Sequence, residues 1–231
     1  MLTILMPVYN ERERVERAID EVLDTILPTP FELIVIDDGS TDGTREILRA
    51  RAERAPSDRL RLIEHAENRG KGAAVRTGLA QARGEFTCVF DADLEYDPED
   101  LARLLAPLLE GAVNACFGVR AFDGYTSHSF LFVLGNKGVT FICNALFNVY
   151  LRDVMTCHKM LRTELFRSLG LGADGFTIEP EIAARLILRG ERIYELPVRY
   201  RARRDSEGKK LTARDGFRVI GMLVRCRLGL H

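Results

Sequence analysis

Three acidic residues, Asp91, Asp93 and Glu95, recur at every second position within the stretch V-F-D-A-D-L-E-Y-D-P, residues 89–98. In extended backbone, alternate side chains share one face, so this spacing places three carboxylates side by side, where their charges repel one another. A hard divalent cation, bound to one or two carboxylates and to the phosphates of a substrate, would relieve that repulsion. The alternative interpretation is a solvated acidic turn, in which Pro98 begins the next helix.

Polar clusters of this kind follow four apolar runs in the first half of the chain. In an open parallel sheet, ligands bind outside the carboxyl ends of the strands, so the four clusters are predicted to form one site. The cluster around Lys71, R-G-K-G, resembles a phosphate-binding turn at a helix N-terminus. It matches neither the P-loop nor the dinucleotide-binding fingerprint, which disfavours P-loop kinases and NAD-dependent dehydrogenases. The clusters are P-V-Y-N-E (7–11), D-D-G-S-T-D-G (37–43), E-N-R-G-K-G (67–72) and D-A-D-L-E (91–95).

The elements that must position these clusters alternate between short apolar runs and segments of helical period. Such alternation predicts an α/β protein with a mostly parallel central sheet that is flanked by helices. The predicted strands cover residues 2–8, 33–36, 60–63, 86–90 and 113–117, and the predicted helices cover 12–25, 44–55, 72–82 and 98–110.

After Arg120 the alternation stops and the predicted elements become irregular in order. No break in composition marks a second domain, so we interpret residues 1–231 as one domain whose second half packs on the sheet. The elements predicted in that half are helices over 135–150 and 182–188, a strand over 193–200, a polar loop over 203–210 and a basic amphipathic helix over 213–228.

The composition is that of an ordinary soluble protein, with 46% hydrophobic and 29% charged residues among 231. Five cysteines without a C-x-x-C pair, and no signal peptide, predict reduced thiols and a cytoplasmic location. The most apolar stretch, 129–151, contains Asn136, Lys137, Asn144 and Asn148, which makes it a poor candidate for a transmembrane span.

The net charge of −1 hides an asymmetry between the body of the chain and its last part. Residues 199–231 contain ten Lys and Arg but only three Asp and Glu. A basic segment on an acidic body predicts an anionic partner, which could be a nucleic acid, a phosphorylated substrate or a membrane surface. No nucleic-acid-binding motif accompanies the basic segment, so a nucleic acid is the least favoured of the three.

The ordered motifs P-V-Y-N-E, V-I-D-D-G-S-T-D-G-T, N-R-G-K-G-A-A-V-R-T-G and D-A-D-L-E-Y-D-P resemble those of glycosyltransferase family 2. Within that family, the chain is most similar to the dolichol- or polyprenol-phosphate hexosyltransferases. The likeness continues through G-F-T-I-E-P-E-I (175–182), R-I-Y-E-L-P-V-R-Y (192–200) and S-E-G-K-K-L-T-A-R-D-G-F-R (206–218). It implies a GT-A type fold, a nucleoside-diphosphate sugar donor such as UDP-glucose or GDP-mannose, and inversion at the anomeric carbon.

The resemblance also divides the chain into two functional halves. Residues 1–120 would bind the nucleotide sugar, and residues 121–231 would form the acceptor side, with a basic lid loop and a C-terminal amphipathic helix. The expected donor-binding residues are Pro7, Tyr9, Glu11, Asp38, Lys71, Ala92, Arg204 and Lys209.

For the chemistry, the resemblance implies that Asp91 and Asp93 form a D-x-D motif around Mg²⁺ or Mn²⁺. Glu95 is the expected third metal ligand, at a position where the mannose synthases often carry glutamine. Arg120 would meet the acceptor phosphate. Many relatives carry a further arginine shortly afterwards, where this chain has Ser129.

Two inverting mechanisms are open. A phosphate acceptor is already an anionic nucleophile, so the enzyme needs only to position it and supply positive charge. A hydroxyl acceptor needs a carboxylate base, for which Glu179 and Glu181 in E-P-E are the candidates. The alternative role of these two acids is to favour the start of a helix at Pro180.

Three functions remain as hypotheses. The first is transfer of a hexose, glucose or mannose, to polyprenyl phosphate, with the 213–228 helix resting on an anionic membrane at the cytoplasmic face. The second is a soluble transferase for a small hydroxylated or phosphorylated acceptor, with that helix packed on the protein. The third is a non-catalytic protein that binds sugar nucleotides.

Overall fold

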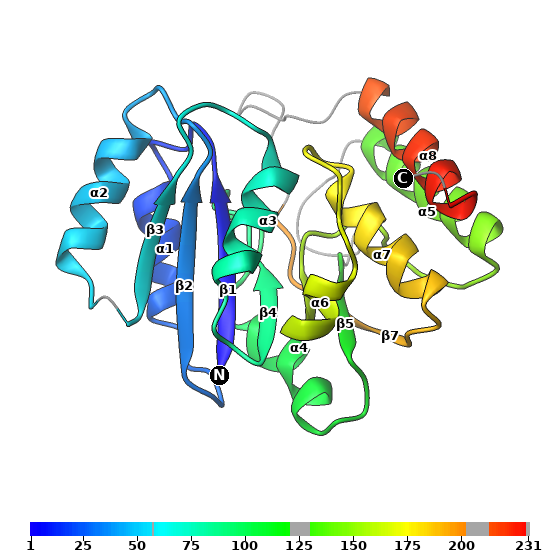
Figure 1. The fold of residues 1–231 in the computed structure, drawn as a ribbon, viewed down its shortest axis with the longest axis horizontal. Coiled ribbons are helices and arrows are strands. Elements are labelled where there is room, and N and C mark those ends of the chain that lie inside the picture. Colours follow the sequence, from blue (N-terminus) through cyan, green and yellow to red (C-terminus); the bar gives the residue numbers. More distant parts are fainter. Residues whose placement is uncertain (57, 121–129, 202–212, 230–231) are drawn as a thin grey trace.

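The computed structural model describes residues 1–56, 58–120, 130–201 and 213–229. Within these residues the chain forms a seven-stranded sheet with the strand order β3-β2-β1-β4-β6-β5-β7 (Figure 1). Neighbouring strands are parallel except where β6 pairs, because β6 runs antiparallel to both β4 and β5. The strands are β1 (Leu2–Val8), β2 (Phe31–Asp37), β3 (Leu60–Glu64), β4 (Phe86–Val89), β5 (Ala115–Arg120), β6 (Lys159–Arg162) and β7 (Ile193–Val198).

Helices cover both faces of the sheet, as the continuous apolar runs of the inner strands predict. The side chains of Leu5 and Ile36 are fully buried on one face, and those of Ile4 and Leu33 are fully buried on the other. One face packs against α1 (Val15–Leu23), α2 (Thr44–Arg54) and α4 (Asp100–Leu109). The other face shares an apolar core with α3 (Lys71–Gln81), α5 (Phe130–Phe147), α6 (Thr163–Ser168) and α7 (Ile178–Leu188), and α8 (Ala213–Arg227) packs on α5 and α7. The predicted α/β fold with a mostly parallel sheet is confirmed.

Two elements of the second half, β6 and α6, have no counterpart in the sequence-based prediction. β6 is only four residues long and contains a lysine and an arginine, so it carries no apolar run. Its place in the sheet comes from its neighbours, because Cys88 of β4 and Cys116 of β5 both pair with Met160. A strand of this kind is defined by tertiary contacts rather than by its own pattern.

The helices of the second half begin and end at different residues from those predicted. α7 begins at Ile178 rather than at residue 182, because Pro180 lies in the first turn, where a missing N–H costs no hydrogen bond. α5 ends at Phe147, where Asn148 takes a left-handed φ of 53° and Asn144 bonds the N–H and the carbonyl of Leu151. The predicted loop 203–210 lies outside the described residues.

Across the four described ranges, no helix has both the length and the apolar character that crossing a bilayer requires.

The N-terminus of α3 lies against the loop that precedes α7, and two glycines allow this contact. A Cβ on Gly72 would lie 2.1 Å from the carbonyl oxygen of Ala173, and one on Gly70 would lie 2.4 Å from that of Asp174. Gly70 also has a φ of 92°, which L side chains rarely adopt. The two glycines of R-G-K-G therefore allow the backbone of the first half of the chain to contact that of the second half closely.

We predict that Gly72→Ala lowers the free energy of unfolding by about 1–3 kcal/mol, because backbone atoms must move to admit the methyl group. Gly221→Ala in α8 is the control, since a Cβ there meets nothing within 4 Å. The control should raise stability by about 0.5–1 kcal/mol through better helix propensity. Urea denaturation measures both, and equal effects of the two substitutions would contradict the prediction.

Candidate active site

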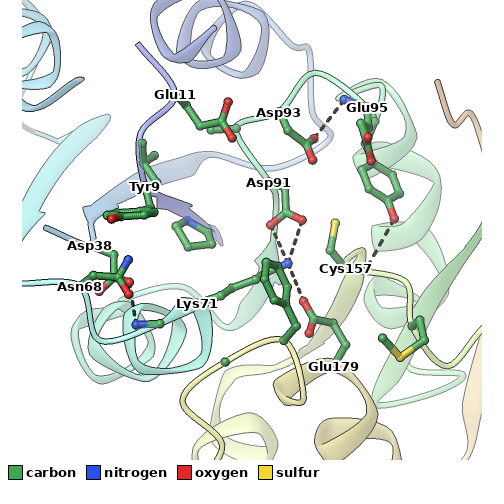
Figure 2. A pocket seen from close by; sticks show the side chains of 18 of the residues that line it. Tyr9, Glu11, Asp38, Asn68, Lys71, Asp91, Asp93, Glu95, Cys157 and Glu179 are labelled. Carbon is green, nitrogen blue, oxygen red and sulfur yellow. Dashed lines mark hydrogen bonds and ion pairs between the residues drawn. The ribbon is translucent and has the colours of Figure 1, made fainter. Parts of the chain in front are cut away.

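A cavity of about 380 Å³ lies at the carboxyl ends of β1, β2 and β4, where the sequence places its polar clusters. Most of the predicted site residues line it, and Figure 2 shows their side chains. Glu181 is not among the lining residues, and Arg204 and Lys209 lie outside the described residues. The predicted residues that line the cavity are Pro7, Tyr9, Glu11, Asp38, Lys71, Asp91, Ala92, Asp93, Glu95, Arg120 and Glu179.

The ammonium group of Lys71 lies between two carboxylates from different parts of the chain (Figure 2). Its Nζ is 2.7 Å from Oδ1 and 2.8 Å from Oδ2 of Asp91, and 2.5 Å from Oε1 of Glu179. Burial disfavours the charged lysine, but the two carboxylates outweigh burial and raise the pKa of Lys71 well above its ordinary value. Burial likewise acts to raise the pKa of Asp91, yet the charge of Lys71 prevails and lowers it.

The expectation that Asp91, Asp93 and Glu95 share one face of extended chain is wrong. β4 ends at Val89, and the chain then turns, with Leu94 in a left-handed conformation at a φ of 61°. Oδ1 of Asp93 accepts the backbone N–H of Glu95 at 3.1 Å, which stabilises that turn.

Among the described residues, no three His, Cys, Asp or Glu side chains converge in a way that could hold a metal ion. Asp91, Asp93 and Glu95 all line the cavity, but the carboxylate of Glu95 already accepts a hydrogen bond of 2.8 Å from the hydroxyl of Tyr200. Two carboxylates fit a Mg²⁺ or Mn²⁺ ion whose other ligands are water and substrate phosphate.

Asp38 fixes the loop that carries Lys71. Its carboxylate accepts the backbone N–H groups of Arg69 at 2.9 Å and Gly70 at 2.7 Å, and it lies 2.7 Å from Nδ1 of His65. A carboxylate has about four acceptor positions, so most of those on Asp38 are used inside the protein. Sequence analysis missed His65, because nothing in its local pattern indicates this contact.

Arg120 lies at the end of β5, and its guanidinium is held by a partner that sequence analysis missed. Nε and Nη2 donate to the two carboxylate oxygens of Asp153 at 2.7 and 2.8 Å, and the ring of Tyr200 lies 5.3 Å away. Burial opposes the charge of Arg120, but its negative partners, Asp153 among them, raise its pKa well above the ordinary value. The bidentate pair sets the orientation of the guanidinium.

The two acids of E-P-E separate in the structure. Glu179 lines the cavity and binds Lys71, whereas Glu181 accepts the N–H groups of Gly172 and Ala173 at 3.0 and 2.8 Å. Glu181 also pairs with Arg185 one turn later in α7. Its carboxylate therefore caps the loop before α7 and lies away from the cavity.

The segment before β6 adds residues to the cavity that sequence analysis did not identify. Met155 and Cys157 line it, and burial raises the pKa of the Cys157 thiol well above its ordinary value. His158 lies behind Cys157, with its ring centroid 4.2 Å from that of Tyr96, and burial lowers its pKa to about 3. A neutral histidine in this place acts as a packed aromatic ring.

The chain is similar in sequence and in fold to known proteins. Residues 3–170 match the pattern described as Glycosyl transferase family 2. The chain is 27% identical to dolichol-phosphate mannosyltransferase from Pyrococcus furiosus, over 97% of this chain and 64% of that protein. It is 28% identical to dodecaprenyl-phosphate galacturonate synthase from Rhizobium johnstonii, over 95% of this chain and 64% of that protein. The chain thus spans less than two thirds of the length of either relative.

Among solved structures, the chain is similar to glucosyl-3-phosphoglycerate synthase from Mycobacterium tuberculosis, crystallised with Mn²⁺, uridine diphosphate and glucosyl-3-phosphoglycerate. The TM-score is 0.73 at 20% identity, over 100% of this chain and 81% of that one. This likeness confirms the predicted GT-A type fold. The match over residues 3–170, which is more than half of the chain, shows that the protein belongs to glycosyltransferase family 2.

Proposed function

We propose that the chain is an inverting hexosyltransferase that moves glucose or mannose from a nucleoside-diphosphate sugar to polyprenyl or dolichyl phosphate. The names of two relatives, at 27% and 28% identity, refer to dolichol phosphate and dodecaprenyl phosphate, which supports a lipid phosphate as acceptor. The fold neighbour was crystallised with uridine diphosphate, which supports a UDP-glucose type of donor, and the name of the mannosyltransferase relative keeps a GDP-mannose type open. Because that neighbour is named for a small acceptor, a small phosphorylated acceptor is the main alternative.

The donor would occupy the cavity at the ends of β1, β2 and β4. Pro7, Tyr9, Glu11, Asp38 and Ala92 all line this cavity, and they would form its nucleoside side. Asp38 would act mainly by fixing the Arg69–Gly70 backbone, since both N–H groups bind its carboxylate.

Asp91 and Asp93 would hold Mg²⁺ or Mn²⁺ together with the donor diphosphate. When bound, the cation would neutralise negative charge on the departing diphosphate. Lys71 adds a second cation beside Asp91. Arg204 and Lys209, outside the described residues, would contribute a basic lid over the same group.

One observation supports the hypothesis of a phosphate acceptor most strongly. Each of the two carboxylates that are candidates for a general base already binds other groups of the protein. Glu179 is ion-paired to Lys71 at 2.5 Å, and Glu181 is occupied by the loop before α7 and by Arg185. The Glu179 oxygen that binds Lys71 and both oxygens of Glu181 are already engaged, and the other oxygen of Glu179 is buried, so within the described part of the chain no carboxylate oxygen of E-P-E is both exposed and unpaired for a sugar hydroxyl. An acceptor phosphate brings its own anionic oxygen, so the reaction requires only orientation and positive charge.

A cationic apolar surface supports the lipid form of that acceptor. α5 and α8 lie side by side (Figure 1). Leu223 of α8 is buried against the protein, so part of its apolar stripe packs inward. Val139, Cys143 and Val219 are buried as well, but other apolar side chains on and next to the two helices are exposed, and so are Arg218, Arg225 and Arg227. The exposed apolar residues are Phe130, Leu134, Phe141, Phe217, Val224 and Leu228.

An amphipathic surface of this kind suits the headgroup region of an anionic membrane, where the apolar side chains enter and the arginines meet lipid phosphate. The first half of the chain, residues 1–120, would then bind the donor, while residues 121–231 would receive the acceptor from the membrane side.

We predict that Asp93→Asn lowers donor turnover by at least about a hundredfold while the protein still folds, because the residue lies in a turn at the cavity. Asp24→Asn, an exposed acid at the end of α1, is the matched control and should keep full turnover. EDTA should abolish turnover of the parent protein, and Mn²⁺ should restore it. Undiminished turnover in EDTA would remove the metal from the mechanism.

We predict that the protein floats with anionic vesicles at low salt and that Phe217→Glu with Phe141→Glu weakens this binding by at least about tenfold. Ile26→Glu is the control, because Ile26 is as exposed, at 92%, but follows α1 on the opposite face of the sheet. Flotation assays measure the binding at several salt concentrations. Equal loss of binding in the control would show that the α5 and α8 surface has no special role.

Product analysis with a short polyprenyl phosphate and with small phosphorylated acceptors completes the test of function. We expect a lipid-linked product from one of the nucleotide sugars. Turnover of a small acceptor, without lipid-linked product from any accepted donor, would favour the alternative function.

A further inference from the structure

Lys159 is a fully buried lysine at the start of β6 that no part of the proposed reaction uses. Its Nζ donates to the carbonyl oxygens of Val154, at 3.1 Å, and Thr156, and it lies 4.7 Å from the ring centroid of Phe117. Burial lowers its pKa to about 8, against the favourable charges of Glu179 and Asp153. A buried ammonium group is costly, so its presence requires an explanation.

Two buried ion pairs contain the acids whose charges favour the ammonium group of Lys159. On the donor side, Glu179 pairs with Lys71, which pairs in turn with Asp91. On the acceptor side, Asp153 pairs with Arg120. The negative charges of Glu179 and Asp153, one from each pair, favour the charged form of Lys159.

Two sets of contacting charges, Asp91–Lys71–Glu179 and Asp153–Arg120, are thus linked through the longer-range electrostatic influence of Lys159. Together with Lys159, the two sets contain equal numbers of acids and bases, so removal of one member leaves a neighbouring charge uncompensated. The members are Asp91, Lys71, Glu179, Lys159, Asp153 and Arg120.

Lys159 also binds the segment that separates the two ion pairs, residues 153–158. That segment supplies Met155 and Cys157 to the cavity wall and begins with the acid that orients Arg120. Two of its side chains leave buried polar atoms without a hydrogen-bond partner, Oγ1 of Thr156 and both ring nitrogens of His158. Its shape thus depends on backbone contacts, two of which end on the lysine.

We propose that Lys159 is a positioning residue for the acceptor side of the cavity. From beneath segment 153–158, it holds Asp153 where that acid orients the guanidinium of Arg120. The ammonium is buried away from the cavity lining, so it acts through the segment and not on the substrate. The inference rests on the proposed function in assigning Arg120 to the acceptor.

The test compares Lys159→Met, which removes charge and donors, with Lys159→Gln, which keeps donors without charge. Thr163→Val is the matched control, because Thr163 is buried at the other end of β6 and bonds Thr87 and Gly84 instead of segment 153–158. Calorimetry of uridine diphosphate with Mn²⁺ measures the donor side. Steady-state kinetics with a short polyprenyl phosphate measures KM and kcat for the acceptor.

We expect Lys159→Met to leave nucleotide affinity within about twofold and to lower kcat/KM for the acceptor by at least about tenfold, with Lys159→Gln in between. Thr163→Val should lower the melting temperature without lowering kcat/KM for the acceptor selectively over nucleotide affinity. Equal loss on the donor and acceptor sides, as from general destabilisation, would overturn the proposal, and so would an unchanged acceptor KM and kcat. If Lys159→Met does not fold, the same measurements are made on Lys159→Gln.

A second readout does not depend on the acceptor. The Nε–H of Arg120 donates to Asp153, so its nitrogen-15 NMR signal should be protected from exchange with water. The signal is assigned by its loss in Arg120→Lys. Fast exchange in Lys159→Met supports the proposal even if no lipid-linked product forms, and retained protection overturns it.

Discussion

The ion pairs of Lys71 hold the candidate site together. Lys71 begins α3 in the first half of the chain, Asp91 follows β4, and Glu179 lies in the first turn of α7 in the second half. One buried ammonium group thus joins three elements across the cavity, and it does so where the glycines on either side allow close backbone contact. Because an unpaired charge in this place is costly, the three elements must assemble together.

The cavity is lined both by acidic residues and by the basic residue Arg120. Asp91 and Asp93 line the cavity and would suit a cation that carries a diphosphate, whereas Arg120, which Asp153 orients, would bind the acceptor in the proposed function. Glu181 is occupied within the protein, and Glu179 is ion-paired to Lys71 through Oε1 while its Oε2 is buried without a hydrogen-bond partner among the described residues, which supports the proposal of an acceptor that is already ionised. The membership in glycosyltransferase family 2 and the arrangement of these charges point to the same class of reaction.

The parts of the fold that could be predicted from sequence are those with a local pattern. β1 and β2 read as continuous apolar runs, and the polar residues that follow them do meet at one edge of the sheet. The turn at Leu94 could not be predicted, because a left-handed leucine has no sequence signature. His65, Asp153 and Lys159 were missed because their partners are distant in sequence or belong to segments without periodicity.

The position of β6 between β4 and β5 has a consequence for the order of folding. β4 and β5 follow one another in the chain, yet they are not neighbours, and β6 must return from residue 159 before either gains that partner. The pairing of β1 with β2 and of β2 with β3 requires shorter loops and a smaller loss of chain entropy. The edge of the cavity that follows β1 and β2 can therefore form early, whereas the wall built by Met155 and Cys157 forms only when β6 enters the sheet.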